Sequence, residues 1–215
     1  MTMTVFSIVL FMYIGLRNSE IIPSKKQSIV ESSYEFISGM IGDNIGNEGM
    51  NYFSFIFTLF LFILVGNLLG MLPYSFTWTS HIIVTFAIAF FIFIGVTFIA
   101  IYKHGIVKFL KFFAPIGVPK PMLILLIPIE IISYLSRPIS LSVRLFANMM
   151  AGHTLLKVIG GFVFVLGANS FIIGGILPLA FLIALTGLEI VIAFLQAYVF
   201  AILTCLYIND AIHLH

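Results

Sequence analysis

Apolar residues fill most of this chain in long runs, and polar residues are confined to shorter segments between the runs. On this pattern the chain divides into the segments 1–16, 17–51, 52–102, 103–120 and 121–208. A helix needs about 20 consecutive apolar residues to cross a bilayer. Two runs of this length, 52–72 and 82–102, predict a pair of ordinary membrane-spanning helices. The first apolar run, residues 5–16, is shorter and predicts a short N-terminal span.

The segment 17–51 is the most polar part of the sequence. Apolar residues recur in it at helical intervals with polar residues on the opposite face, namely Val30, Tyr34, Ile37 and Ile41 against Glu31, Ser32, Glu35 and Ser38. This pattern predicts a short amphipathic helix lying along the membrane surface. Ser28 and Glu31 have the spacing of an N-terminal capping box. A solvated loop is the alternative interpretation of this segment.

The segment 103–120 is a basic loop between apolar runs. Its charged residues are all lysines, namely Lys103, Lys108, Lys111 and Lys120. By the positive-inside rule this loop faces the cytoplasm or, in an organelle, the matrix. The turn that contains Trp78, which we expect to be an interfacial aromatic residue, then faces the opposite side of the membrane.

The segment 121–208 consists of two apolar stretches, each too long for one ordinary span. Residues 121–166 and 171–208 are separated only by Gly167–Ser170. A helix of about 40 residues is about 60 Å long, twice the thickness of the hydrocarbon core. Either each stretch folds into two spans, or each is one steeply tilted helix. Because no polar turn interrupts either stretch, we predict a hairpin of two long tilted helices.

Composition places the whole chain in a bilayer. Of its 215 residues, 61% are hydrophobic and 8% are charged, whereas a soluble domain has about 25% charged residues. We therefore predict an all-α integral membrane protein with a single membrane domain, residues 1–215. The net charge of +2 gives no reason to expect a nucleic acid partner. Neither a metal nor a cofactor is expected from the residue pattern.

Arg144 lies inside an apolar stretch, and its guanidinium stays charged at every physiological pH. Charged residues at bilayer depth are costly and usually functional. Glu130 and Arg137 precede Arg144 at intervals of seven residues, so all three lie on nearly one helix face. Small and polar residues share this face, namely Ser133, Ser136, Ser140, Ala147, Asn148 and Ala151. Because small side chains let another helix approach closely, we predict a positively charged docking face.

Titratable and polar residues accompany this face. His153 lies about 180° around the helix from Arg144, and Glu189 and Gln196 are seven residues apart in the second arm. A carboxylate beside an imidazole can transfer protons near neutral pH. Glu130 is a second proton-accepting group, about 21 Å from Arg144 along the helix. Because a permanent cation between such groups blocks direct leakage, the set predicts two offset half-channels that meet a moving carboxylate.

Other interpretations of these residues stay open. Arg144 can be a structural counter-ion of Glu130 or Glu189. Arg137 can extend toward the membrane surface, and His153 can be a hydrogen-bonded interior histidine. For the whole chain, a secondary cation/proton transporter is the alternative function, although the internal repeats typical of that class are absent from the sequence.

Several motifs follow one another between Tyr52 and Asp210. They are Gly66-Asn-Leu-Leu-Gly70-Met-Leu-Pro73, Ile129-Glu130-Ile-Ile-Ser133, Ser140-Leu-Ser-Val-Arg144-Leu-Phe-Ala-Asn148-Met-Met-Ala-Gly152-His153 and Leu188-Glu189-Ile-Val-Ile-Ala-Phe-Leu-Gln196-Ala-Tyr-Val-Phe200. In these motifs the chain resembles subunit a of the rotary F-type ATP synthase. The arginine-centred motif is highly specific, whereas residues 1–50 match only in pattern.

The resemblance implies a proton-conducting stator subunit without a catalytic site of its own. The family's arginine matches Arg144 and faces a rotating ring of c subunits. The residues then expected to face this rotor are Ser133, Ser136, Arg137, Ser140, Ala147 and Ala151. The half-channel on the intermembrane or periplasmic side is expected at His153, Glu189, Asn148 and Gln196. The other half-channel is expected near Glu130.

The same resemblance implies the partners and the membrane. Besides protons and the bilayer, the expected partners are the c ring, peripheral-stalk subunits such as b, and other membrane subunits of the complex. A histidine at position 153 followed by a glutamate at 189 resembles the mitochondrial arrangement. A multi-pass protein of the mitochondrial inner membrane is therefore expected, with the bacterial plasma membrane as the alternative.

Overall fold

The computed structural model describes residues 1–17, 23–71, 77–112, 120–169 and 173–212, which contain helices and no strand. In chain order the elements are α1 (Thr2–Leu16), α2 (Lys25–Asn44), the 3-10 helix η1 (Asn47–Tyr52), α3 (Phe53–Gly70), the 3-10 helix η2 (Trp78–Ser80), α4 (Ile82–His104), α5 (Ile106–Phe112), α6 (Lys120–Asn169) and α7 (Ile173–Ile212). The all-α membrane fold predicted from the sequence is confirmed.

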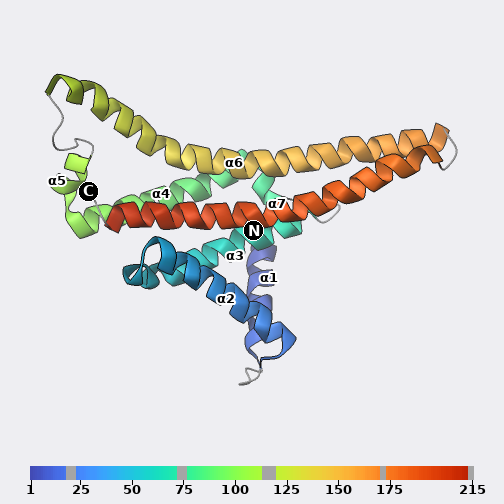
Figure 1. Cartoon of the computed structure of the whole chain (residues 1–215), viewed down its shortest axis with the longest axis horizontal. Helices are drawn as coiled ribbons and strands as arrows, with labels where there is room; N and C mark the ends of the chain where they lie inside the picture. The colour runs from blue at the N-terminus through green and yellow to red at the C-terminus, as the bar shows by residue number, and fades with distance from the viewer. Residues whose placement is uncertain (18–22, 72–76, 113–119, 170–172, 213–215) are drawn as a thin grey trace.

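The helices α6 and α7 dominate the molecule. They contain 50 and 40 residues, and they lie side by side along its longest axis (Figure 1). At 1.5 Å per residue, α6 is about 75 Å long, far more than a perpendicular span requires. The prediction of two long helices in place of four short ones is therefore confirmed. The helix α6 runs to Asn169, and residues 170–172 lie outside the described part of the chain.

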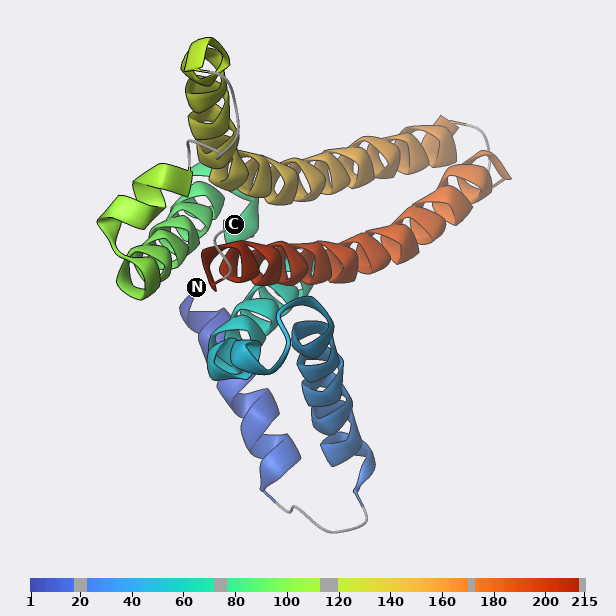
Figure 2. The same ribbon diagram turned by 60° about the vertical axis from the view of Figure 1, so that its left-hand side comes forward.

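The helix α6 is bent, and its first part points away from the direction of the rest (Figure 2). Pro128 and Pro138 lie inside this helix. A proline lacks the N–H that would bond to the preceding turn, and its ring clashes with that turn's carbonyl. Both prolines precede Arg144, and Glu130 lies between them, so Glu130 is in the proline-containing part of α6, ahead of the part that carries Arg144 and His153.

The helices α3 and α4 support the long pair. The helix α3 packs against α7, and α4 packs against both α6 and α7. Residues of all these helices form the buried core, including Ile56, Phe60, Ile63, Ala89, Ile92, Leu141, Leu145, Ala197, Ala201 and Ile208. The alanines of α7 have no side chain beyond Cβ, which lets the neighbouring helices approach closely.

The helices long and apolar enough to cross a membrane, within the described ranges, cover Glu48–Gly70, Ile82–His104, Met122–Gly167 and Ile176–Ile212. The helix α1 has 15 residues and is about 22 Å long, shorter than the hydrocarbon thickness of about 30 Å. The first span therefore stays a prediction. The basic loop contains the short helix α5 after Gly105, and residues 113–119 of that loop are not described.

The amphipathic helix predicted in 17–51 is confirmed as α2, but its start differs from the prediction. It begins at Lys25, and the Ser24 hydroxyl accepts a hydrogen bond from the Gln27 N–H, so Ser28 is not the cap. Val30, Ile37 and Ile41 are buried. Because α2 packs against α1, α3 and α7, its apolar face covers protein, and its place along the membrane surface stays a prediction.

Candidate functional site

The small-residue face of α6 is open. Ser133, Ser136, Ser140, Arg144, Ala147 and Ala151 are all exposed in the isolated chain. The opposite face is closed, since Leu141, Leu145 and Met149 are at most 3% exposed against the other helices. The helix thus presents a strip of small side chains around one arginine, a surface into which a partner helix can pack closely.

Arg144 is exposed at the centre of this strip. Its guanidinium forms no hydrogen bond or ion pair with any residue that the structure describes. The alternative of a structural counter-ion to Glu130 or Glu189 is therefore not what the structure shows. A guanidinium has several N–H donors, and those of Arg144 are available to a carboxylate from outside the chain.

Arg137 differs from Arg144 although both were expected on the rotor-facing surface. Its guanidinium donates a hydrogen bond to the Asp210 carboxylate of α7 at 2.9 Å. It also lies over the rings of Tyr134 and Tyr207, at 5.3 and 5.0 Å from their centroids. These cation–π and ionic contacts hold the charge between α6 and α7. Arg137 is therefore engaged within the chain, although 25% of its side chain is exposed, and its contact with a rotor stays a prediction.

Glu189 of α7 is buried, with 6% of its surface exposed. Neither carboxylate oxygen has a hydrogen-bond partner in the described part of the chain. The carboxylate lies directly against Gly152 of α6, where a Cβ atom would collide with Oε1. An unpaired buried carboxylate is costly unless it is protonated or hydrated. This position therefore suits a group that takes up and releases a proton.

His153 directly follows Gly152, the residue against which this carboxylate lies. Its Nε2 atom is 3.0 Å from Oγ1 of Thr77, in the connection between α3 and α4. The Thr77 hydroxyl donates to the Gly70 carbonyl at 3.0 Å. Because the hydroxyl has only one proton, Nε2–H of His153 must then be the donor to Oγ1. This leaves Nδ1 of a neutral His153 as an acceptor.

Further buried polar groups surround this pair, and the sequence interpretation missed them. Asn67 donates to the Ala193 carbonyl at 3.4 Å, while its Oδ1, Trp78 Nε1 and Thr79 Oγ1 have no partner among the described residues. Trp78 is only 4% exposed, so it is not an interfacial anchor. A signal was present in the spacing of Gly66 and Gly70, which make room for Trp78 and Thr77.

No hydrogen bond connects the remaining predicted residues to this cluster within the described part of the chain. Glu130, Asn148 and Gln196 are partly buried, and none has a hydrogen bond or ion pair recorded among the described residues. Glu130 lies in the first part of α6, which starts on the same side of the molecule as α5 (Figure 1). The structure therefore has the buried Glu189 carboxylate beside the partly buried His153 near η2, a separate carboxyl group toward the basic segment, and an exposed arginine between them.

Comparison with known proteins shows the family of this chain. Residues 1–209 match the family model described as ATP synthase A chain. ATP synthase subunit a of Pelagibacter ubique is 59% identical over 215 residues, covering 100% of this chain and 86% of the relative. The subunit a of Paramagnetospirillum magneticum is 54% identical over 218 residues, covering 100% and 87%.

These relatives are bacterial, which corrects the mitochondrial assignment expected from the order of His153 and Glu189. The order of these two residues does not distinguish organelles from bacteria here. The family comprises the proton-translocating stator subunit of the Fo sector, which is not catalytic itself, because catalysis takes place in F1. On the extent of the match and the identity to its relatives, this chain belongs to the ATP synthase A chain family.

Proposed function

We propose that this chain conducts protons through two offset half-channels that load and unload carboxylates on a ring of c subunits. The observation that carries the proposal is that Arg144 is exposed on the open face of α6 and has no hydrogen bond or ion pair with a described residue. The relatives' family membership supports an Fo stator, with peripheral-stalk subunits such as b as further partners and the bacterial plasma membrane as its location.

One half-channel is proposed at the partly buried His153 and the buried Glu189. The unpaired Glu189 oxygens and the polar atoms of Asn67 and Thr79 need hydrogen-bond partners, since buried polar atoms are rarely left unsatisfied. Water can supply these bonds, and the Glu189 carboxylate can also take up a proton. These groups lie near η2, on the side opposite the lysines of the basic segment. We therefore place the periplasmic inlet here, with Glu189 as its proton-exchanging group and Asn148 and Gln196 as polar neighbours.

The other half-channel is proposed near Glu130. The bend in α6 separates this residue from His153, and about 21 Å of helix separates it from Arg144. A proton therefore cannot pass directly from one carboxyl group to the other. It has to travel on a partner group that moves past the open strip of Ser133, Ser140 and Ala147.

Arg144 is proposed to keep the passing carboxylate ionised and to block leakage. At 4 Å and an effective dielectric constant of about 20, the attraction between the two charges is about 4 kcal/mol. This is enough to displace a proton from a partner acid that arrives between the half-channels. The guanidinium itself cannot relay protons, because it does not deprotonate in proteins.

The test is ATP synthesis by the whole complex in proteoliposomes under an imposed proton gradient. We expect Arg144→Ala and Arg144→Lys to abolish coupled synthesis while the complex still assembles, because an alanine has no charge and a lysine can lose its proton. The control is Arg137→Lys, which keeps a cation beside Asp210 and should retain synthesis. Normal proton-driven synthesis by Arg144→Ala would reject the proposal.

A further inference from the structure

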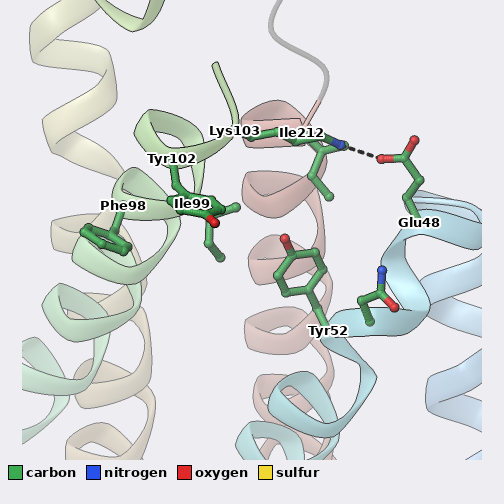
Figure 3. Close-up of a pocket in the computed structure, with 8 residues that line it drawn as sticks. Glu48, Tyr52, Phe98, Ile99, Tyr102, Lys103 and Ile212 are labelled. Carbon is green, nitrogen blue, oxygen red and sulfur yellow. Dashed lines mark hydrogen bonds and ion pairs between the residues drawn. The ribbon is translucent and has the colours of Figure 1, made fainter. Parts of the chain in front are cut away.

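A cavity of about 460 Å³ lies between η1, the end of α4 and the end of α7, and neither His153 nor Glu189 lines it. Figure 3 shows its lining side chains. Its residues are Glu48, Asn51, Tyr52, Phe98, Ile99, Tyr102, Lys103 and Ile212. Nothing in the proposed proton pathway uses this cavity.

The cavity lies where several candidate spans end. The span Glu48–Gly70 begins beside it, and the spans Ile82–His104 and Ile176–Ile212 both finish there. His104 Nε2 donates a hydrogen bond to the Ile212 carbonyl at 3.0 Å, which holds the two helix ends together. Spans of 23 residues are about 35 Å long and cross the hydrocarbon core with little excess. The cavity is therefore at the membrane–water boundary, on the side of the lysine-bearing segment.

The chemistry of the lining changes with depth. At the outer end, Lys103 Nζ and the Glu48 carboxylate form an ion pair at 2.5 Å, with side chains 42% and 60% exposed. Tyr52 lies next, with its hydroxyl directed toward the level of the ion pair (Figure 3). Phe98 is five residues before Lys103, about 7.5 Å deeper in the bilayer. Charged, amphipathic and apolar groups thus succeed one another from water to hydrocarbon.

We propose that this cavity binds a phospholipid whose headgroup carries a phosphate and a primary ammonium, as in phosphatidylethanolamine. The Lys103 ammonium binds the phosphate, and the Glu48 carboxylate accepts hydrogen bonds from the headgroup ammonium. Tyr52 and Asn51 are at the depth of the glycerol esters, and an acyl chain lies along Phe98 and Ile99. The inference goes beyond the proposed proton pathway and does not depend on it.

Charge complementarity selects this headgroup. A protein ion pair of opposite charges matches a ligand that has both charges a few bonds apart, and each charged contact is strengthened at the low-dielectric edge of the membrane. An anionic headgroup without an amine would place its phosphate beside the Glu48 carboxylate with nothing to neutralise it. A choline headgroup has no N–H to donate to Glu48.

The experiment uses the intact complex reconstituted in nanodiscs. A phosphatidylethanolamine with a diazirine at the start of one acyl chain is photolysed in the complex, and the cross-linked peptides are identified by mass spectrometry. We expect cross-links at residues 98–103. Unlabelled phosphatidylethanolamine should suppress them at a concentration about fivefold lower than phosphatidylglycerol does, a difference of about 1 kcal/mol.

Matched variants separate recognition of the headgroup from misfolding. Lys103→Ala should reduce cross-linking about fivefold. Glu48→Gln leaves one cation in the cavity, so the lipid preference should reverse in favour of phosphatidylglycerol. Such a reversal can occur only if the site is still folded. Lys108→Ala, an exposed lysine on α5 that does not line the cavity, should behave as the wild type.

Specific outcomes overturn the proposal. One is equal suppression by phosphatidylethanolamine and phosphatidylglycerol in the wild type. Another is an unchanged preference in Glu48→Gln. A third is the absence of cross-links at 98–103 while other surfaces of the same complex are labelled, which would show that a neighbouring protein subunit covers this cavity.

Discussion

At the scale of single residues, the site depends on how closely two helices approach at one position. Gly152 of α6 has only a hydrogen where the Glu189 carboxylate of α7 lies. His153, the next residue, is held by Thr77 from another element at 3.0 Å. The carboxylate and the imidazole are thus placed by steric fit and by one hydrogen bond, and neither is fixed by an ion pair with another described residue.

We expect Gly152→Ala to slow proton-driven ATP synthesis roughly tenfold, because the added methyl displaces the carboxylate at a cost of about 1–3 kcal/mol. The measurement is the rate of synthesis by the reconstituted complex, normalised to the amount of assembled subunit. Assembly should change little, since the atom that has to move is the end of a flexible side chain.

The matched control is Gly161→Ala in the same helix, where a Cβ atom meets nothing within 4 Å. It makes the same chemical change and adds the same helix propensity. Equal rates in the two variants would mean that the contact between Gly152 and Glu189 has no part in proton transfer.

At the scale of elements, α6 and α7 are joined near the basic side by the contacts of Arg137. Its guanidinium connects α6 to Asp210 and lies over Tyr134 and Tyr207. The Tyr134 hydroxyl is 2.8 Å from Thr97 Oγ1, so α4 is linked to the same cluster. This cluster lies at the bent part of α6, where the prolines weaken the helix's own hydrogen bonding.

We expect Arg137→Ala to destabilise the chain more than Asp210→Asn does. Arg137→Ala removes an ion pair and the contacts with two rings, which together contribute about 1–2 kcal/mol of stability. Asp210→Asn removes only the half-exposed ion pair, which contributes less than about 1 kcal/mol. Unfolding of the purified chain in mixed detergent micelles measures both values.

The double variant tests whether the two residues act together. Because they share one contact, its free-energy change should be smaller than the sum of the single changes. Strict additivity would show that the two charges do not interact. Arg137 would then be free to contact a rotor.

At the scale of the whole molecule, both ends of the spans are chemically marked. Lys103 and Lys108 lie at the end of α4 and on α5, whereas η2 and the start of α4 carry no described lysine or arginine. The positive-inside rule therefore orients the chain with α5 toward the cytoplasm. The neighbouring His153 and Glu189 are then nearer the periplasmic side, because His153 contacts the connection between α3 and α4.

Labelling of single cysteines checks this orientation in intact cells. A membrane-impermeant maleimide should react with His81→Cys from outside, and with Lys108→Cys only in inverted vesicles. The native Cys205 is fully buried, so it gives little background. The opposite pattern would reverse the assignment of the two half-channels to their sides of the membrane.

The sequence by itself determined the class of the protein, its long helical hairpin and the special position of Arg144. These features follow from local properties of the sequence, namely the length of the apolar runs, the absence of turn residues and the energetic cost of a charge in a bilayer. The amphipathic face of α2 followed in the same way from helical periodicity. Family membership was also evident from motifs of contiguous residues.

Tertiary structure decided which of the polar residues meet. Arg137 and Arg144 are seven residues apart on one helix face, yet only Arg137 is bound, because the bend of α6 and the position of Asp210 bring a partner to one and not to the other. Thr77 and Asn67 join the site because loops and helices far apart in sequence pack there. Such pairings depend on the distances between helices, which cannot be predicted from the periodicity of residues along the chain.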